Sequence, residues 1–325
     1  MSYLVKHEIF CYFRGMPELP EVQTTVNGLN QEVRGLKIAE VWTSYNSKFH
    51  VGKNNIKNPD YFKLFKKAVV GAKIEKAERV GKNILIRLTG STSSPQINQT
   101  ILIHMKMTGH LLYGKYEKGP ALWRPEGGAG PLSHSRNQFI RLVFSLSNGK
   151  HLAFSDMRKF AKVLFFETAE TESLEDLKVL GPNPLSEDFT QKVFEAQIFR
   201  KPNWPIKQVL MSQEIIAGIG NIYADEMLWH AGIHPLSKPK KIPKKELVLL
   251  FRAMKKVLSQ GVALGGASDV DYRNIYGETG RFQETFNAYR LTGEKCKKRS
   301  CSGKIERIKV GARSAHFCNV HQIKY

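Results

Sequence analysis

Acidic residues are scarce in this chain. Its 325 residues include 29 Asp and Glu against 50 Lys and Arg, which leaves a formal net charge of +21 and a pI near 9.8. Such an imbalance points to a polyanionic partner, with nucleic acid first and an anionic membrane surface second. Long apolar runs are also missing, and their absence excludes a membrane-spanning helix.

Cysteine is scarce as well, and three of the four cysteines lie within the last thirty residues. Cys296, Cys301 and Cys318 cannot form a closed set of disulfides, so metal binding or free thiols and a reducing compartment are expected. A signal peptide is not expected in residues 1–15, because charged residues interrupt the apolar stretch and no small-residue cleavage site follows.

The cysteine-rich tail has the spacing of a metal site. Cys296-x4-Cys301 is followed by sixteen residues and then by Cys318-x2-His321. Two such pairs on either side of a hairpin-length spacer are how proteins assemble a tetrahedral Zn²⁺ site. A module of about forty residues has too little core to fold alone, so one structural zinc ion is predicted. His316 is the rival fourth ligand.

The remaining patterns predict an α+β protein of two or three domains. Residues after Met16 have the apolar spacing of an amphipathic helix, with proline and acidic residues in its first turn. From about 36 to 166, short apolar or alternating runs separated by turns predict an antiparallel sandwich or barrel. The Gly- and Pro-rich stretch 114–138 is expected to be a mobile loop.

Composition changes mark the predicted boundaries farther along the chain. The sequence predicts an acidic linker, a mainly helical region that ends in a polar loop, and a basic tail with ten Lys and Arg against two Asp and Glu. No internal repeat is visible. The predicted segments are an extension at 1–15, an N-terminal domain at 16–166, a linker at 167–188, a helical domain at 189–285 and a tail at 286–325.

Six motifs in one order then resemble a known family. They are Met16-Pro-Glu-Leu-Pro-Glu-Val22, Gly81-Lys82, His104-Met-Lys-Met107-Thr-Gly109, Asp156-Met-Arg158-Lys-Phe160, Gly218-Ile-Gly-Asn221-Ile-Tyr-Ala-Asp-Glu226 and the tail motif. Together they resemble the bacterial formamidopyrimidine-DNA glycosylases, the 8-oxoguanine DNA glycosylases, over residues 16–325. Any one motif would be weak evidence, but six in order are specific.

The resemblance implies an N-terminal helix plus β-sandwich with catalytic residues, a helix-two-turn-helix domain with a lesion-binding loop, and a C-terminal zinc finger. It implies a bifunctional DNA glycosylase and AP lyase that excises 8-oxoguanine and formamidopyrimidines and cuts the strand by β,δ-elimination in base excision repair. The implied partner is double-stranded DNA with oxidised bases or abasic sites. A monomer in the bacterial cytoplasm, associated with the nucleoid, is expected.

The resemblance assigns the chemistry to five residues. Pro17 would be the nucleophile, because an α-amino group has a pKa of about 8 and is partly neutral at pH 7. Its attack on the sugar C1′ would give a Schiff base. Glu18 would be the general acid and base, and Glu21 would support the site. Lys82 would bind phosphate and aid elimination, and Arg313 would assist the second elimination.

Pro17 is internal in this chain, and an acylated ring nitrogen cannot form a Schiff base. We expect translation to begin at Met16, so that residues 1–15 are absent from the mature protein. The alternative is a chain that is made in full and is either trimmed or inactive.

DNA recognition is implied for a second group of residues. The damaged base must leave the duplex to be reached, and Met107, Arg158 and Phe160 match the residues that fill the gap. Arg158 would pair with the orphaned cytosine. Phosphate contacts, which carry most of the affinity, are implied for Asn221 at a helix start, Lys207 and His104.

Two departures and three alternatives remain at this stage. The Cys-x4-Cys spacing and the terminal His321 replace the family's usual x2 spacing and cysteine. One alternative is an enzyme similar to endonuclease VIII that removes oxidised pyrimidines, although Leu19 favours the purine branch. A non-catalytic binder of damaged DNA, if the extension is retained, is another, and an RNA-binding zinc protein is a distant third.

Overall fold

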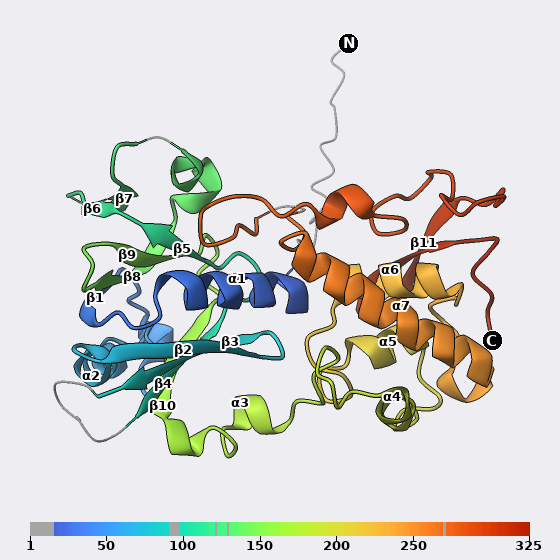
Figure 1. The fold of residues 1–325 in the computed structure, drawn as a ribbon, viewed down its shortest axis with the longest axis horizontal. Coiled ribbons are helices and arrows are strands. Elements are labelled where there is room, and N and C mark those ends of the chain that lie inside the picture. The colour runs from blue at the N-terminus through green and yellow to red at the C-terminus, as the bar shows by residue number, and fades with distance from the viewer. Residues whose placement is uncertain (1–15, 91–97, 121, 129, 269–270) are drawn as a thin grey trace, which may run out of the picture.

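The computed structural model describes residues 16–90, 98–120, 122–128, 130–268 and 271–325. The chain forms two lobes side by side, one rich in strands and one mainly helical (Figure 1). The predicted fold is confirmed: a β-sandwich domain, a helix-two-turn-helix domain and a C-terminal Cys3His cluster follow each other along the chain. The predicted extension at 1–15 lies outside the described residues.

Helix α1 (Leu19–Glu32) is the first element of the N-terminal lobe. Pro20 lies in its first turn, where a missing N–H costs nothing. Its buried face carries Val22, Val26 and Leu29, as their spacing predicted, and packs on β2. Helix α1 also packs against α7 (Lys244–Ala263) of the second lobe, so α1 touches both lobes.

Two four-stranded antiparallel sheets form the sandwich. Their strand orders are β1-β8-β9-β5 and β10-β4-β3-β2, and the main core lies between them. The predicted apolar runs fall inside strands β3, β4, β8 and β10. The strands are β1 (Ile38–Thr43), β2 (Lys73–Val80), β3 (Asn83–Thr89), β4 (Gln99–His104), β5 (His110–Gly114), β8 (Ile140–Leu146), β9 (His151–Ser155) and β10 (Lys162–Glu167).

One helix within this region was not predicted. Helix α2 (Pro59–Val69) packs Phe65 and Val69 into the sandwich core, although only strands were expected between 36 and 166. The start signals were present in the sequence: Asn58 caps the helix by accepting from Asp60 N at 3.2 Å, and proline occupies the first helical position. The turn η1 (Lys48–His50) precedes it.

The stretch 114–138, expected to be a mobile loop, contains regular structure in the residues described there. This stretch holds strands β6 (Tyr116–Lys118) and β7 (Trp123–Pro125) and the turns η2 (Pro131–Ser133) and η3 (Ser135–Asn137). We call this stretch the insertion. Its apolar side chains pack with a small cluster on the outer face of the sheet that contains β5, and this cluster gives the insertion a core of its own.

The predicted linker, 167–188, also has some regular structure. It contains η4 (Thr168–Glu170) and α3 (Glu175–Lys178), and Leu177 of α3 packs on the N-terminal core. The chain then crosses to the second lobe (Figure 1).

Four helices build the second lobe, around an aromatic core that includes Phe189, Phe194 and Tyr223. Helix α6 is buried on all sides along nearly its whole length, including Asp225 and Glu226, whereas α7 has one buried face. The helices are α4 (Gln191–Ile198), α5 (Ile206–Met211), α6 (Asn221–Ala231) and α7 (Lys244–Ala263), with the turn η5 (Pro239–Lys241) before α7.

The segment between α7 and residue 282, described at 264–268 and 271–281, returns to the N-terminal lobe before the chain enters its last module (Figure 1). We call this segment the strap. Ile275 of this strap is 1% exposed and belongs to the N-terminal core, and Tyr113 N donates to its carbonyl oxygen at 2.6 Å. Arg136 of the insertion forms an ion pair with Asp271 of the strap. The linker and the strap therefore connect the lobes in addition to the contacts of α1.

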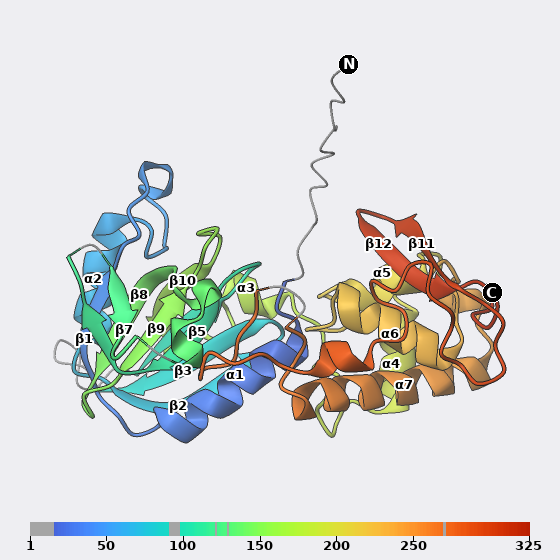
Figure 2. The ribbon, with the colours of Figure 1, turned by 90° about the horizontal axis from the view of Figure 1, so that it is seen from above.

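The C-terminal module ends in a hairpin of β11 (Ile305–Val310) and β12 (Arg313–Cys318), preceded by the turn η6 (Phe282–Thr285). The hairpin projects from one side of the helical lobe (Figure 2). Within the described ranges, no helix combines the length and apolar character needed to cross a bilayer.

Candidate active site and metal centre

Glu18 lies where the two lobes meet. Its side chain is 3% exposed, and its carboxylate accepts from Ile222 N at 2.9 Å and from Tyr223 N at 3.4 Å. These N–H groups belong to the first turn of α6, where the helix dipole favours an anion. Glu18 thus occupies the N–H groups of Ile222 and Tyr223, and these two groups are not open to a phosphate.

The Gly218-Ile-Gly220 motif is what allows this approach. Gly218 has φ +96, a conformation that favours glycine, and its carbonyl accepts from Leu19 N at 3.0 Å. A Cβ on Gly220 would overlap the Glu18 carboxyl group. The two glycines therefore let the start of α1 contact the start of α6.

Glu21 joins three parts of the site. It is 1% exposed and accepts from Glu18 N at 2.8 Å, from the Tyr223 hydroxyl at 2.6 Å and from Ala267 N at 2.6 Å. The last bond ties the start of the strap to the segment that follows Pro17. Burial raises the pKa of Glu21, while these hydrogen bonds oppose the rise.

Burial also raises the pKa of Glu18, to about 7, although Lys82 opposes that shift. Lys82 is itself buried at 7% exposure, and burial lowers its pKa while the two carboxylates raise it. Arg313, at the start of β12, is close enough to lower the pKa of Lys82 further. The structure thus gathers four predicted catalytic and supporting residues next to buried Pro17.

The three predicted gap-filling residues also come together. The Arg158 guanidinium donates to Met107 Sδ at 3.1 Å and lies 4.5 Å from the centre of the Phe160 ring. Phe160 is 50% exposed. The structure therefore places an apolar, a cationic and an aromatic side chain at one point of the surface.

A buried aspartate holds the two loops that carry these residues. Asp156 is fully buried and accepts from the Thr108 hydroxyl at 2.7 Å, from the Tyr45 hydroxyl at 2.8 Å and from Ala161 N at 3.0 Å. Thr108 in turn accepts from Arg158 N at 3.1 Å. We call these contacts of Asp156 and Thr108 the latch. Sequence reasoning missed its role, although Asp156 begins one of the six motifs.

His104 can bind phosphate only as a neutral donor. Its Nδ1 accepts from Lys106 N at 3.0 Å, which leaves the hydrogen on Nε2. Burial, with Lys106 and Lys82 nearby, lowers the pKa of His104 to about 3. Its predicted role remains open to a hydrogen bond rather than an ion pair.

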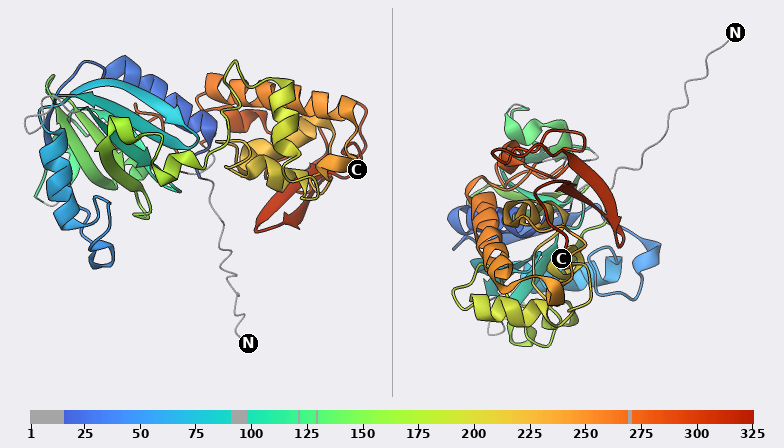
Figure 3. Two further views of the ribbon diagram at one scale, coloured as in Figure 1. Left: turned by 90° about the horizontal axis from the view of Figure 1, so that it is seen from below. Right: turned by 90° about the vertical axis from the view of Figure 1, so that its right-hand side faces the viewer.

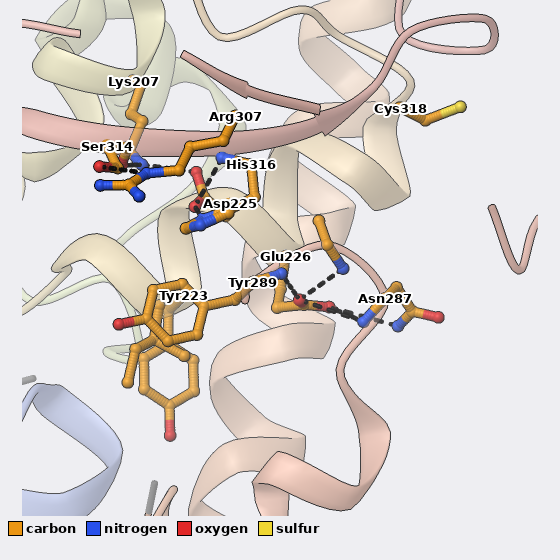
Figure 4. Close-up of polar contacts among 12 residues, drawn as sticks. Lys207, Tyr223, Asp225, Glu226, Asn287, Tyr289, Arg307, Ser314, His316 and Cys318 are labelled. Atoms are coloured by element: carbon orange, nitrogen blue, oxygen red, sulfur yellow. Dashed lines mark hydrogen bonds and ion pairs between the residues drawn. The ribbon is translucent and has the colours of Figure 1, made fainter. Parts of the chain in front are cut away.

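The predicted phosphate contact of Lys207 does not hold. Its ammonium group is fully buried, 2.6 Å from Asp225 and 2.5 Å from the Ser314 carbonyl oxygen (Figure 4). Asp225 also accepts from His316 through N at 3.0 Å and Nδ1 at 2.9 Å. A buried ammonium paired in this way cannot reach DNA; it fastens β12 to helices α5 and α6 beside Arg313.

Glu226, the next residue on α6, holds the entry to the C-terminal module. Its carboxylate accepts from the backbone N–H groups of Asn287, Ala288 and Tyr289 at 2.9–3.1 Å (Figure 4). Sequence reasoning did not identify this role, because the partners lie about sixty residues away.

The predicted metal ligands cluster on this module. The ligand atoms of Cys296, Cys301, Cys318 and His321 all lie within 4.8 Å of one another. Zn–S bonds of about 2.3 Å in a tetrahedron place the ligands about 3.8 Å apart, and the sulfurs of Cys301 and Cys318 are 3.6 Å apart. The donor set and its spacing fit Zn²⁺.

Histidine geometry favours His321 over His316 as the fourth ligand. His321 Nδ1 lies 3.2 Å from the Cys296 sulfur, and its Nε2 is 3.0 Å from the Trp229 carbonyl oxygen. A metal-binding histidine usually donates its other N–H to such an acceptor. His316 is instead held by Asp225.

We predict that His321→Ala loses most of the zinc of the wild-type chain, whereas His316→Ala retains it. Zinc released by denaturation is measured with a chromogenic chelator. Chelation of the wild type should also change Trp229 fluorescence, because its ring lies 5.1 Å from that of His321. Equal zinc content in the two variants would contradict the assigned ligand set.

The comparisons with known proteins agree with this geometry. The formamidopyrimidine-DNA glycosylase N-terminal domain profile matches residues 16–163, and the H2TH domain profile matches residues 180–272. The formamidopyrimidine-DNA glycosylase of Herpetosiphon aurantiacus is 35% identical over 307 residues, which cover 94% of this chain and 100% of that relative. That of Chloroflexus aurantiacus is 34% identical over 308 residues, 95% of this chain and 98% of the relative.

Solved structures give the same result. A complex of Lactococcus lactis Fpg with DNA containing an abasic site has a TM-score of 0.76 at 28% identity, covering 94% of this chain and 100% of that one. A complex of the same protein with DNA containing Fapy-dG has a TM-score of 0.75 at 29% identity, with the same coverage. The chain belongs to the formamidopyrimidine-DNA glycosylase family of base excision repair.

Proposed function

We propose that this protein excises oxidised purines from double-stranded DNA and then cleaves the strand at the abasic site. The observation that carries the proposal is the buried cluster of Glu18, Glu21 and Lys82 directly after Pro17, at the junction of the lobes. A perturbed pair of carboxylates beside a buried lysine is typical of a catalytic centre.

In the proposed reaction, the neutral ring nitrogen of Pro17 attacks the sugar C1′ as the bond from C1′ to the base nitrogen breaks. The base leaves with a proton. The Pro17 nitrogen then loses its own proton, the C1′–O4′ bond breaks as O4′ is protonated, and the nitrogen and C1′ are left as an iminium ion on the opened sugar. Loss of a C2′ proton then expels the 3′ phosphate, and a second elimination expels the 5′ phosphate. Glu18, with a pKa of about 7, is present in both protonation states near neutrality and can give and take these protons.

Oxidised purines are proposed because related complexes contain Fapy-dG and because Leu19 favours that branch. A related Lactococcus lactis Fpg complex contains an oxidised pyrimidine, at 28% identity and a TM-score of 0.75. Excision of oxidised pyrimidines is therefore the second candidate, and the choice of duplex in the first experiment separates the two.

Catalysis by Pro17 requires a working form that begins at this residue. The N-terminal family profile starts at residue 16, which supports initiation at Met16 followed by removal of the methionine. The peptide bond between Met16 and Pro17 must be absent from the active protein, because only a free amine can become an iminium ion.

We predict that a chain beginning at Pro17 gives a covalent adduct when borohydride is added during reaction with an 8-oxoguanine:cytosine duplex. Borohydride reduces the iminium ion to a stable amine. A chain that retains residues 1–16, verified by intact mass, should give none. A thymine glycol duplex is the matched substrate control. An adduct from the longer chain, or none from the shorter one, would sink proline catalysis; stronger trapping on thymine glycol would favour the second candidate.

We predict that base excision slows above about pH 7 as Glu18 loses the proton it donates, and that Glu18→Gln removes this limb of the profile. The free energy of unfolding should also fall as the pH rises. The pKa of Glu18 is raised from 4.5 in the folded protein, so ionising Glu18 costs folding free energy as the pH rises from about 4.5 through 7. Single-turnover rates and urea unfolding of both proteins between pH 5 and 8.5 measure the two effects. Parallel pH profiles would contradict this role.

The latch gives a separate prediction about opening the duplex. Thr108→Val removes the hydroxyl that links Asp156 to Arg158 N, so the gap-filling residues should lose their fixed positions. We expect duplex binding at an abasic analogue to weaken about tenfold, or 1.4 kcal/mol, and base flipping, followed by 2-aminopurine fluorescence, to slow. Borohydride trapping on a single-stranded abasic substrate should change little.

Thr190→Val is the matched control, because it removes a hydroxyl that caps α4 in the other lobe, at a typical cost of about 1 kcal/mol. Urea unfolding of both variants gives the stability that each one loses, so that changes in binding are compared with changes in folding. If both weaken duplex binding equally, the effect of Thr108 is one of folding alone.

A further inference from the structure

A second projection leaves the molecule on the same side as the β11–β12 hairpin. It consists of residues 47–57, which we call the arm, and it extends from the N-terminal lobe beside α2 (Figure 2). Both views of Figure 3 show the arm and the hairpin pointing to the same side. The two projections stand on different lobes, with the junction of the lobes between them.

The arm is held in shape by its own contacts. Ser47 N donates to the Lys57 carbonyl oxygen at 3.0 Å and closes the neck, and the Asn58 side chain donates to the Lys53 carbonyl oxygen at 3.2 Å. Ile56 is fully buried, and its N–H donates to the Val163 carbonyl oxygen of β10 at 3.1 Å. These contacts fix the direction in which the tip points.

The tip exposes apolar and basic side chains in alternation. Phe49 is 88% exposed and Val51 is 66% exposed, beside exposed Lys48 and Lys53. Residues 44–58 contain no Asp or Glu, and no carboxylate among the described residues pairs with Lys48 or Lys53. The fold gains little from a phenylalanine left in water, whereas an aromatic ring between lysines is what nucleic-acid surfaces bind.

The base of the arm is connected to the loops that carry Met107, Arg158 and Phe160. Tyr45, just before the neck, donates to Asp156 of the latch at 2.8 Å. The Lys57 ammonium lies 5.6 Å from the centre of the Tyr45 ring and close enough to Lys106 for each to feel the other's charge. Positive charge therefore continues from the loop of Met107 into the arm.

A groove of about 1000 Å³ lies between the arm and the linker. Its far wall includes Glu167, Glu170, Glu175 and Asp176, and an acidic wall repels a phosphate backbone. This charge separation favours DNA contact at the tip rather than in the groove.

We propose that the arm is a second DNA-binding element. It holds the duplex on one flank of the lesion, while the β11–β12 hairpin, which points the same way from the other lobe, lies on the other flank. Lys48 and Lys53 bind backbone phosphates, and Phe49 packs against sugars or base edges in the groove between them. This inference rests on the proposed function, because it takes damaged duplex DNA as the ligand.

The test compares the wild type with Phe49→Ser and with the double variant Lys48→Ala, Lys53→Ala on duplexes centred on a tetrahydrofuran abasic analogue. Dissociation constants are measured by fluorescence anisotropy over a series of salt concentrations. One duplex has about ten base pairs on each side of the lesion, one helical turn, and the other has about five.

On the long duplex, we expect Phe49→Ser to bind about tenfold more weakly. We expect the lysine variant to lower the slope of log K against log salt by about 1 to 2, because each phosphate contact contributes about 0.9. On the short duplex both differences should shrink or vanish. Lys63→Ala and Leu64→Ala on α2, which change exposed residues just beyond the arm, are the matched controls and should match the wild type.

Equal effects on both duplexes, or arm variants that match the α2 controls, would overturn the proposal while leaving the glycosylase function intact. If the wild type binds the abasic duplex no more tightly than an undamaged duplex of the same length, the proposed function itself is contradicted. Concentration-dependent self-association that Phe49→Ser abolishes, seen by sedimentation, together with unchanged DNA affinity, would assign the tip to a second copy of the chain.

Discussion

The contact between the start of α1 and the start of α6 is the constraint on which this structure depends. The Glu18 carboxylate accepts from Ile222 N and Tyr223 N and so joins the residue after Pro17 to the helical lobe. Glu21 repeats the connection through the Tyr223 hydroxyl. Because both carboxylates are shared between the lobes, the buried cluster beside Pro17 exists only when the lobes are correctly placed.

That contact is costly by itself, since two buried carboxylates close together oppose ionisation. The raised pKa of Glu18 is the visible sign of the cost, and the helix N-terminus and Lys82 offset only part of it. A fold selected for stability alone would place apolar residues here. The arrangement is useful because a carboxyl group poised near neutral pH can both donate and accept a proton.

Local patterns predicted much of this molecule, and distance along the chain explains what they missed. Apolar periodicity placed α1 and the long strands, because its repeat is only a few residues long. Ligand spacing identified the Cys3His cluster, because each pair of ligands lies within a few residues. Helix α2 was missed although its cap at Asn58 was readable. Lys207 was misassigned because its partner Asp225 comes from another helix, and a lone lysine is normally exposed. No spacing rule links Thr108 to Asp156 across forty-eight residues.

Helix α6 shows why such long-range contacts gather at one element. It is buried on nearly every side, so its polar groups must find partners inside the protein. Its N-terminus holds Glu18, Asp225 holds Lys207 and β12, and Glu226 holds the backbone at 287–289. The segment that follows Pro17, the hairpin with Arg313 and the entry to the Cys3His module are thus all bonded to one buried helix. Their relative positions are then set by hydrogen bonds to a rigid core rather than by the loops that carry them, which is how groups distant in sequence can be held in register for one reaction.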